Sequence, residues 1–404
     1  MMKQQNNKKK KTWTRLRHKI VTAVLRYPVG WYCRLRYGLR YPRHRDLIQR
    51  QSLILLNHQT PFDQFFVGLF FKNPVYYMAT EDIFSNGWVS KLIKFLVAPI
   101  PIKKQTTDIQ AVMNCIKVVR EGGSIAIAPE GNRTYSGKTE YMNPAIGAMA
   151  KKLGLPIVLL RIVGGYGMEP RWSDVVRRGK LEVQINRIIE PEEAKAMKPE
   201  ELVKAIEEGL YVNEACVDHT YHHKNLAQYM ERAIYVCPQC GLSAFESNGD
   251  ILQCKKCGRK TRYLPTKELE GVGFESPFHF VNDWYEYQKD YVNSIDPTVH
   301  TDAPIYEDTA NLSEVIVYKR KNLLQKDISV KLYGNRLELG DMVLPFEDIS
   351  TVAVLGRNKL NIYYKDQLFQ LKSHKRFCAL KYVNLFYRCK NIMRGEQDGE
   401  FLGL

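Results

Sequence analysis

The chain has 404 residues, of which 45% are hydrophobic, so it is long enough for two or three domains with buried cores. Its net charge of +17 is unevenly distributed, because residues 1–50 hold six Lys and nine Arg against the single acid Asp46. This segment therefore carries +14, and the rest of the chain carries only +3. The composition excludes a protein that is basic throughout and describes a near-neutral protein with a basic front end.

The basic front end contains the pattern of an amphipathic helix. The pattern begins at Trp13, and Pro28 is expected to kink or divide the helix. Its apolar face comprises Trp13, Leu16, Ile20, Val24, Tyr27 and Trp31, and the basic residues opposite are Arg15, Lys19 and Arg26. Such a helix is typical of an interfacial anchor on anionic lipid. A helix packed on its own domain and a nucleic-acid-binding arm are the alternatives.

Targeting signals and cysteine usage point to the inside of the cell. The N-terminus is polar and lysine-rich, without the apolar core or cleavage site of a signal peptide. The apolar stretch 20–33 falls short of the ~18 residues that a spanning helix needs, and it contains Arg26. We therefore expect an intracellular protein with reduced thiols.

A polar segment follows the first strand-like run of the chain. Residues 53–56 predict a buried strand, and residues 64–71 predict a buried helix with Pro61 in its first turn. This places His58 at the carboxyl end of a strand and Asp63 just inside the helix. A carboxylate there can accept the imidazole N–H and leave the other ring nitrogen free as a base. The alternative is a loop histidine followed by an ordinary acidic residue in a first helical turn.

A second polar loop follows a second strand-like run. Residues 124–128 predict a strand, and residues 129–134 read Pro-Glu-Gly-Asn-Arg-Thr. Open α/β sheets bind ligands at the carboxyl ends of their strands, and arginine is well shaped to bind phosphate. Arg133 is therefore a candidate phosphate ligand, with a loop ion pair as the alternative.

Together the two loops resemble motifs of the glycerolipid acyltransferase family, which includes the lysophosphatidic acid acyltransferases. His58 and Asp63 match the H-x-x-x-x-D motif, with Thr60 where the longer form of that motif has Ser. The P-E-G-T-R-S block is matched at Pro129, Glu130, Gly131 and Arg133, with Asn132 replacing Thr and Thr134 replacing Ser.

Two further blocks are similar to those of the family. Ile100-Pro101-Ile102-Lys103-Lys104 is similar to an I-x-I-x-R-like segment with Lys104 replacing Arg, and residues 155–158 resemble an apolar strand entered through proline. The order and spacing of all four blocks agree, and the resemblance covers roughly residues 10–225. The Asn132 and Lys104 substitutions bear on the acceptor more than on the reaction.

The resemblance implies transfer of a fatty acyl group from acyl-CoA or acyl carrier protein to the free hydroxyl of a lysophospholipid. The first expectation for the acceptor is 1-acyl-glycerol-3-phosphate, which gives phosphatidic acid. His58 acts as general base, and Asp63 orients it. The family transfers the acyl group directly, so no serine or cysteine nucleophile is required. The expected substrate-binding residues are Glu130, whose role is left open, and Gly131, Arg133, Lys103 and Lys104.

The surrounding elements predict an α/β fold with a mostly parallel sheet covered by helices on both faces. Further strands are predicted over 75–79, 99–102 and 157–163, and helices over 88–95, 108–120 and 145–153.

Two CxxC pairs follow this region, each with a glycine directly after it. The cysteines are Cys237, Cys240, Cys254 and Cys257. Four thiolates in two such pairs predict a structural zinc ribbon with a closed tetrahedral site, in preference to disulfides or iron. His219, His222 and His223 also lie together, but they are interpreted as histidines of a surface helix rather than as metal ligands.

The C-terminal region predicts a small α+β module that resembles the pleckstrin-homology-like fold in architecture. Strands are predicted over 314–319, 328–333, 336–339, 342–345, 349–355, 359–364 and 367–371, with a helix over 375–393. No motif supports this resemblance, and such modules bind lipid headgroups, proteins or neither.

The sequence thus predicts five regions: a membrane-associating region (1–50), an acyltransferase domain (51–225), a zinc ribbon (226–265), a linker (266–312) and the C-terminal module (313–395). The expected protein is a peripheral enzyme at the cytoplasmic face of the cell membrane, with an anionic membrane surface as its partner. The alternatives are an acyltransferase acting on another lysolipid, such as a lyso-aminolipid without a phosphate, and a zinc-ribbon nucleic-acid-binding protein. The ribbon adds only modest positive charge, which argues against nucleic acid.

Overall fold

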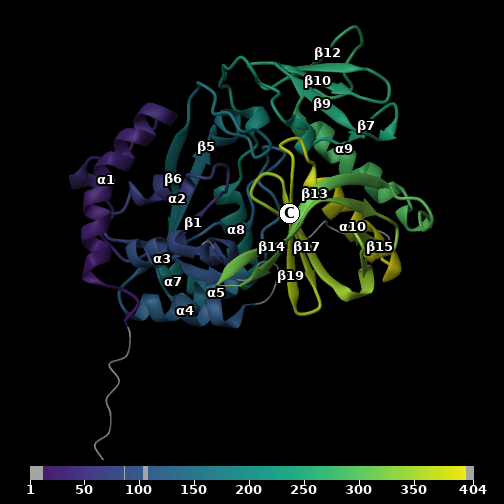
Figure 1. Ribbon diagram of the computed structural model, residues 1–404. Helices are drawn as coiled ribbons and strands as arrows, with labels where there is room; N and C mark the ends of the chain where they lie inside the picture. The colour runs from purple at the N-terminus through teal and green to yellow at the C-terminus, as the bar shows by residue number, and fades with distance from the viewer. Residues whose placement is uncertain (1–11, 86, 103–107, 318, 397–404) are drawn as a thin grey trace, which may run out of the picture.

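The computed structural model describes residues 12–85, 87–102, 108–317 and 319–396 (Figure 1). Within these residues the chain forms a six-stranded sheet, a two-stranded ribbon, a four-stranded sheet and a seven-stranded sheet. The six-stranded sheet belongs to the N-terminal part of the chain, and the seven-stranded sheet to the C-terminal part (Figure 1).

The six-stranded sheet is parallel except at one edge. Its order is β3–β2–β4–β1–β5–β6, and β6 pairs antiparallel with β5. The strands are β1 (Leu53–Leu56), β2 (Val75–Thr80), β3 (Ile100–Ile102), β4 (Ser124–Ile127), β5 (Ile157–Val163) and β6 (Glu182–Ile189). The prediction of a mostly parallel α/β sheet is confirmed, whereas β6 was not predicted.

The central strand β1 contributes to two separate cores, because successive side chains of a strand point to opposite faces. Leu53 and Leu55 are buried in one core, and Ile54 and Leu56 in the other. The first core also contains residues of α4 (Ile109–Arg120), α5 (Ala145–Leu153), α7 (Pro191–Ala196) and α8 (Pro199–Leu210). The second contains residues of α1 (Leu16–Tyr37), α2 (Asp63–Gly68) and α6 (Gly165–Met168). Helices therefore cover both faces of the sheet, as predicted.

Of the two expectations for Pro28, a kink or a division, division is wrong, because helix α1 continues through it. The side of the helix that carries Arg26 faces the protein, because this guanidinium donates to the carbonyl oxygens of Leu69 and Phe71 just after α2. The predicted apolar face is turned outward, and its exposed members within α1 are Leu16, Ile20, Val24, Tyr27 and Trp31.

Trp13 precedes α1 and departs from this pattern. It is half-buried, and its Nε1 donates to the carbonyl oxygen of Ala98 at 2.8 Å. Among the described residues, no helix is both long and apolar enough to cross a bilayer.

The four cysteines lie in a region of short antiparallel strands. These are β7 (Val236–Cys237), β8 (Gly241–Leu242), β9 (Phe245–Asn248), β10 (Ile251–Cys254), β11 (Lys260–Tyr263) and β12 (Leu269–Gly271). The stretch 266–312, expected as a linker, contains β12, the 14-residue helix α9 (Val281–Ser294) and the start of the C-terminal sheet. The buried stripe of α9 includes Gln288, which hydrogen-bonds the backbone of residues 233–236, so a polar residue interrupts the apolar pattern.

The C-terminal module is a fully antiparallel sheet of order β16–β15–β14–β13–β19–β18–β17. Its strands are β13 (Tyr306–Ile316), β14 (Arg320–Leu332), β15 (Arg336–Leu339), β16 (Met342–Pro345), β17 (Ile349–Leu355), β18 (Lys359–Tyr364) and β19 (Gln367–Ser373). Helix α10 (Ala379–Met393) ends the module. Its first hairpin starts seven residues before the predicted boundary at 313. Most of β13 is exposed or half-buried, so its sequence resembles that of a loop.

One hydrophobic core connects the three parts of the molecule. Tyr135, Tyr166 and Trp172 from the N-terminal domain belong to the same buried cluster as side chains of the cysteine-rich region and the C-terminal module. The three regions are therefore packed together rather than joined only by the chain, which brings loops from different regions into contact. Helix α3 (Gly87–Leu96) lies on the side of the N-terminal domain that carries α1 (Figure 1).

Candidate active site

His58 leaves the sheet at the carboxyl end of β1, where two hydrogen bonds to β5 continue the strand pairing. The side chain of Asn57 accepts from the amide of Ile162 at 2.7 Å and donates to its carbonyl oxygen at 2.8 Å. Because β1 lies between β4 and β5, this arrangement places His58 in the middle of the row formed by the carboxyl ends of the strands.

His58 and Asp63 form a hydrogen-bonded pair. His58 Nδ1 lies 2.7 Å from Asp63 Oδ2, and the carboxylate is buried. The same carboxylate accepts from the amides of Gln59 and Thr60 at 2.8 and 3.0 Å, and from Thr60 Oγ1 at 2.7 Å. Four donors thus fix its position, and the Thr60 that replaces the family's serine supplies two of them, its amide and its hydroxyl.

This geometry determines which imidazole nitrogen is free. With Nδ1 donating to Asp63, the lone pair of the neutral ring is on Nε2. The His58 side chain keeps 27% of its surface exposed, so its ring can meet a ligand from solvent. The pair can therefore act as a general base at the surface of the protein.

The second loop contacts the first through Glu130. Glu130 Oε1 accepts from the His58 amide at 2.8 Å, and Oε2 accepts from the Glu140 amide at 2.9 Å. The Thr134 amide also donates to the His58 carbonyl oxygen at 3.2 Å. Burial raises the pKa of Glu130 to about 8, against the two amide hydrogen bonds, which favour its charged form. Both carboxyl oxygens of Glu130 therefore accept hydrogen bonds from within the protein.

Gly131 and Arg133 occupy the tip and the end of the second loop. Gly131 has φ of +70°, a backbone conformation that favours glycine, and its amide donates to the Ala128 carbonyl oxygen at 3.0 Å. Burial lowers the pKa of Arg133 to about 10, with the charges of Arg171 and Arg357 acting in the same direction. The charge of Asp63 opposes this shift, so Arg133 lies within electrostatic reach of the His58–Asp63 pair.

Lys103 and Lys104, predicted as additional phosphate ligands, lie outside the described residues. The other predicted members of the site (His58, Asp63, Glu130, Gly131 and Arg133) come together where β1 and β4 end. The two loops meet because β1 and β4 are paired neighbours in the sheet.

Two arginines at this site were missed by the sequence analysis. Arg171 is buried, its Nη1 donates to the Arg133 carbonyl oxygen at 2.9 Å, and its guanidinium stacks on Tyr135. Arg357 comes from the C-terminal module, and its Nη2 pairs with Glu169 Oε1 at 2.6 Å. Neither arginine belongs to a recognisable motif, so only the packing of the domains reveals them.

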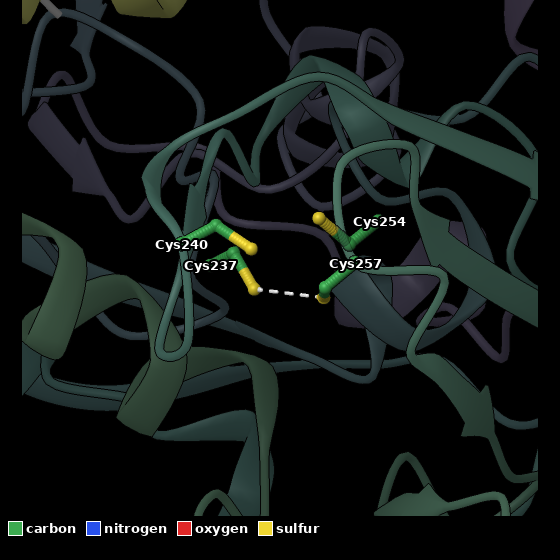
Figure 2. Close-up of side chains that lie close together, drawn as sticks. All are labelled: Cys237, Cys240, Cys254 and Cys257. Carbon is green, nitrogen blue, oxygen red and sulfur yellow. Dashed lines mark hydrogen bonds between the residues drawn. The ribbon is translucent and has the colours of Figure 1, made fainter.

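The four cysteines form a second cluster, at the ends of short strands. Cys237 and Cys240 flank the turn between β7 and β8, and Cys254 and Cys257 flank the turn after β10 (Figure 2). The glycine after each pair, Gly241 or Gly258, has positive φ of 68° or 76°. Each CxxC pair therefore presents two sulfurs from one tight turn, as the spacing predicts.

The cluster has the dimensions of a tetrahedral thiolate site. All four sulfurs lie within 4.8 Å of one another, and the Cys237 and Cys257 sulfurs are 3.8 Å apart (Figure 2). A zinc–sulfur bond of about 2.3 Å implies sulfur–sulfur distances of about 3.8 Å in a tetrahedron. The residues present thus fit a zinc ion with no position left for water.

The three histidines near the ribbon behave differently. His219, His222 and His223 lie in irregular backbone rather than in the expected surface helix, and His222 forms an isolated bridge with Arg178. Within the described part of the chain, the cysteine cluster is the group whose ligand atoms are close enough to hold a metal ion.

Comparisons with known proteins agree with the location of the first cluster. Residues 39–163, which include both loops, match a family model described as Acyltransferase. The chain is 24% identical over 104 residues to the chloroplastic 1-acyl-sn-glycerol-3-phosphate acyltransferase BAT2 of Brassica napus, a match that covers 26% of this chain. It is 30% identical over 60 residues to the 1-acyl-sn-glycerol-3-phosphate acyltransferase of Bacillus subtilis, a match that covers 15% of this chain.

The chain spans 30% of the length of each of these two relatives. Among solved structures, it is similar to the 1-acyl-sn-glycerophosphate acyltransferase PlsC from Thermotoga maritima. The two share 20% identity with a TM-score of 0.40, and the match covers 47% of this chain and 75% of that one. The sequence matches support the glycerolipid acyltransferase family for the N-terminal domain.

Proposed function

We propose that this protein is a peripheral membrane O-acyltransferase that acylates a lysophospholipid, with 1-acyl-glycerol-3-phosphate as its acceptor and phosphatidic acid as its product. The observation that carries the proposal is the 2.7 Å contact between His58 and Asp63 beside the Glu130–Arg133 loop. The acyltransferase match over residues 39–163 and the names of the two curated relatives support the same chemistry.

The proposed reaction needs one base and no covalent intermediate. His58 Nε2 takes the proton of the acceptor hydroxyl as that oxygen attacks the thioester carbonyl, and the C–O bond forms. The C–S bond then breaks, and the leaving thiolate of coenzyme A or acyl carrier protein receives the proton from the imidazolium. Asp63 stabilises the imidazolium and holds the ring, and general-base catalysis of this kind contributes roughly 10²–10⁴-fold.

The acceptor phosphate is proposed to bind at Arg133. Guanidinium groups bind phosphate through parallel hydrogen bonds, and Arg133 lies within electrostatic reach of the base. Lys103 or Lys104 adds positive charge in this proposal. Gly131 shapes the turn, because its own amide already bonds Ala128.

The membrane surface is proposed to contact the outward face of α1 and the adjacent α3. Trp31 and Leu35 on α1, and Trp88 and Phe95 on α3, are exposed. Arg17 joins the two helices, because its Nε donates to the Phe95 carbonyl oxygen at 2.9 Å. An exposed apolar face within a segment of strong positive charge suits the cytoplasmic face of an anionic membrane.

The four cysteines are proposed to bind a structural zinc ion. A closed four-thiolate site stabilises a fold and supplies no water for chemistry. Cys237 and Cys254 belong to the core that also contains Tyr135, two residues from Arg133. The ribbon therefore supports the packing of the candidate site from outside.

The proposed function is tested by an acceptor screen with labelled acyl-CoA and acyl–acyl carrier protein, using detergent-solubilised full-length protein. We expect transfer to 1-acyl-glycerol-3-phosphate, and loss of that transfer in His58→Ala. Transfer to a lyso-aminolipid in preference to the phosphorylated acceptor would identify the other lysolipid class. Equal rates for wild type and His58→Ala with every acceptor would refute the proposed reaction.

A further inference from the structure

The turn between β17 and β18 of the C-terminal module lies against the loop that follows β4. Gly356 in this turn has φ of +64°, and its carbonyl oxygen accepts from Arg171 Nε at 3.0 Å. The Arg357 carbonyl oxygen accepts from the Tyr135 hydroxyl at 3.1 Å. Contacts from the N-terminal domain to the backbone therefore hold the turn in place, independently of the Arg357 side chain.

The Arg357 side chain points back toward the N-terminal domain, where its acidic partners are shared. Its Nη2 pairs with Glu169 at 2.6 Å, and its Nη1 lies 3.4 Å from Asp174. Glu169 also accepts from the Tyr37 hydroxyl at 2.8 Å, and Asp174 pairs more closely with Arg232 at 2.7 Å. Two carboxylates, Glu169 and Asp174, thus face the guanidinium groups of Arg232 and Arg357, and the charges of Arg133 and Arg171 lie within electrostatic reach, so positive charge exceeds negative charge here.

Arg133 and Arg357 each have one hydrogen-bond donor that lacks a partner among the described residues. Arg133 Nη1 and Arg357 Nε are buried and have no hydrogen-bond partner among the described residues. Arg357 also helps to lower the pKa of Arg133 to about 10, after the larger effect of burial. Arg171 bonds the carbonyl oxygens of both Arg133 and Gly356, which places the Arg133 loop beside the Arg357 turn. Unsatisfied buried donors are unfavourable, and an anion bound by both guanidinium groups removes that cost.

The remaining nitrogens of Arg171 already have partners. Its Nη2 donates to the Val354 carbonyl oxygen at 3.2 Å, in addition to the bonds that its Nε and Nη1 make with Gly356 and Arg133. Arg171 is therefore a structural link between the domains. Arg357 keeps 29% of its side chain exposed, comparable with the 27% of His58, so part of it is accessible from solvent.

We propose that Arg357 is a second phosphate ligand of the acceptor site, and that it binds the acceptor's phosphomonoester together with Arg133. This inference rests on the proposed function. The C-terminal module then completes the acceptor site, and the acyltransferase domain alone holds only part of it. Two arginines that approach one phosphate from different domains select phosphorylated acceptors, because an acceptor without the phosphate leaves the buried donors Arg133 Nη1 and Arg357 Nε unsatisfied.

Kinetics of the full-length protein test this role, with the variants Arg357→Ala and Arg357→Lys. The matched control is Arg376→Ala, which removes a comparable ion pair of the C-terminal region, that with Glu231. We expect Arg357→Ala to raise KM for 1-acyl-glycerol-3-phosphate roughly ten- to a hundredfold, with the KM of the acyl donor unchanged. Arg357→Lys recovers part of this loss, and Arg376→Ala leaves KM unchanged.

Two further measurements distinguish the phosphate of the lipid acceptor from free phosphate. They also distinguish failure of the Arg357 role from failure of the proposed reaction. Transfer to monoacylglycerol of the same chain length should be equally slow in wild type and Arg357→Ala. Inorganic phosphate, titrated at constant ionic strength, should raise the melting temperature of wild type and Arg376→Ala but not of Arg357→Ala. An unchanged acceptor KM, or an increase confined to the acyl donor, overturns the role of Arg357 and leaves the proposed reaction standing. If wild type acylates nothing, the proposed function fails, and the phosphate titration alone decides the inference.

Discussion

The two clusters of reactive side chains lie in loops at strand ends, yet they are constructed in opposite ways. The loops after β1 and β4 bring together unlike groups, and His58 and Arg357 remain partly exposed. The turns beside β7 and β10 bring together four identical sulfurs that face one another (Figure 2). An open cluster of unlike groups keeps hydrogen-bonding capacity for a substrate, whereas a closed cluster of like groups directs all of its capacity to one ion.

This contrast implies a division of labour between the two sites. Substitutions in the open cluster should reduce activity and leave the fold intact, because its groups are poised for a ligand. Substitutions in the closed cluster should reduce stability first, and activity only through the loss of packing.

The largest effect is expected for His58→Ala. Removal of the general base should lower kcat/KM by roughly 10²–10⁴-fold, because the hydroxyl then loses its proton acceptor. The melting temperature should change little, since the imidazole is partly exposed. Steady-state kinetics and thermal unfolding measure the two effects separately, with the exposed His222→Ala as the control. A His58→Ala protein that unfolds would contradict the expectation that substitutions in the open cluster leave the fold intact.

The second effect is expected for the closed cluster. Cys257→Ser removes one thiolate ligand with little loss of packing, because Cys257 is exposed. We expect the variant to lose its zinc and to lose several kcal/mol of its free energy of unfolding. It should therefore unfold at a lower temperature than wild type. The exposed Cys216→Ser lies outside the cluster and serves as the control. Metal analysis should give one zinc per wild-type chain, and a metal-free wild type of full stability would contradict the prediction.

How far the sequence predicts the molecule depends on how locally each feature is encoded. The His58–Asp63 pair lies within five residues, and its loop meets Glu130 because the preceding strands are direct neighbours in the sheet. The cysteine cluster was predictable for the same reason, since each CxxC pair occupies one turn. Short-range motifs that follow neighbouring strands therefore predicted most residues of the candidate site.

Features that depend on distant packing were missed. Arg357 is a single arginine in a hairpin turn, and nothing in its local sequence indicates that the turn contacts Arg171, which also bonds Arg133. Helix α9 was missed because Gln288 occupies the centre of its buried stripe, where it satisfies backbone groups of the cysteine-rich region. Strand β6 was missed because an edge strand with many exposed residues lacks the apolar run of its neighbours. The expected roles of Lys103 and Lys104 stay predictions.

A smaller effect is expected on the outward face of α1, which should determine where the enzyme works rather than whether it reacts. Val24→Glu places a charge on the exposed stripe, and we expect it to weaken binding to anionic vesicles roughly tenfold. Val24 is 62% exposed, and Val299, at 69%, gives the matched control Val299→Glu near the C-terminal module. Vesicle co-sedimentation measures the difference. Equal loss in both variants would assign the effect to net charge instead of to this face.

Glu130 is the member of the open cluster that resembles the closed one, because both of its carboxyl oxygens bond amides inside the protein. Burial raises its pKa to about 8, from an unfolded value of 4.5. Between these values the unfolded chain releases a proton that the folded chain retains, so the contribution of Glu130 to stability falls as pH rises from about 4.5 to about 8 and is constant above that.

Glu130→Gln should therefore flatten the decline of stability between about pH 5 and about pH 8, measured by urea unfolding, with the exposed Glu200→Gln as the control. Some slope should remain, because burial also raises the pKa values of Glu140 and Glu214. The variant should also lose about 1–3 kcal/mol at every pH, since glutamine offers one acceptor oxygen for two amides. An unchanged slope would mean that Glu130 is charged in the folded protein. Glu130 would then add a negative charge beside His58, while its two oxygens still accept from the His58 and Glu140 amides.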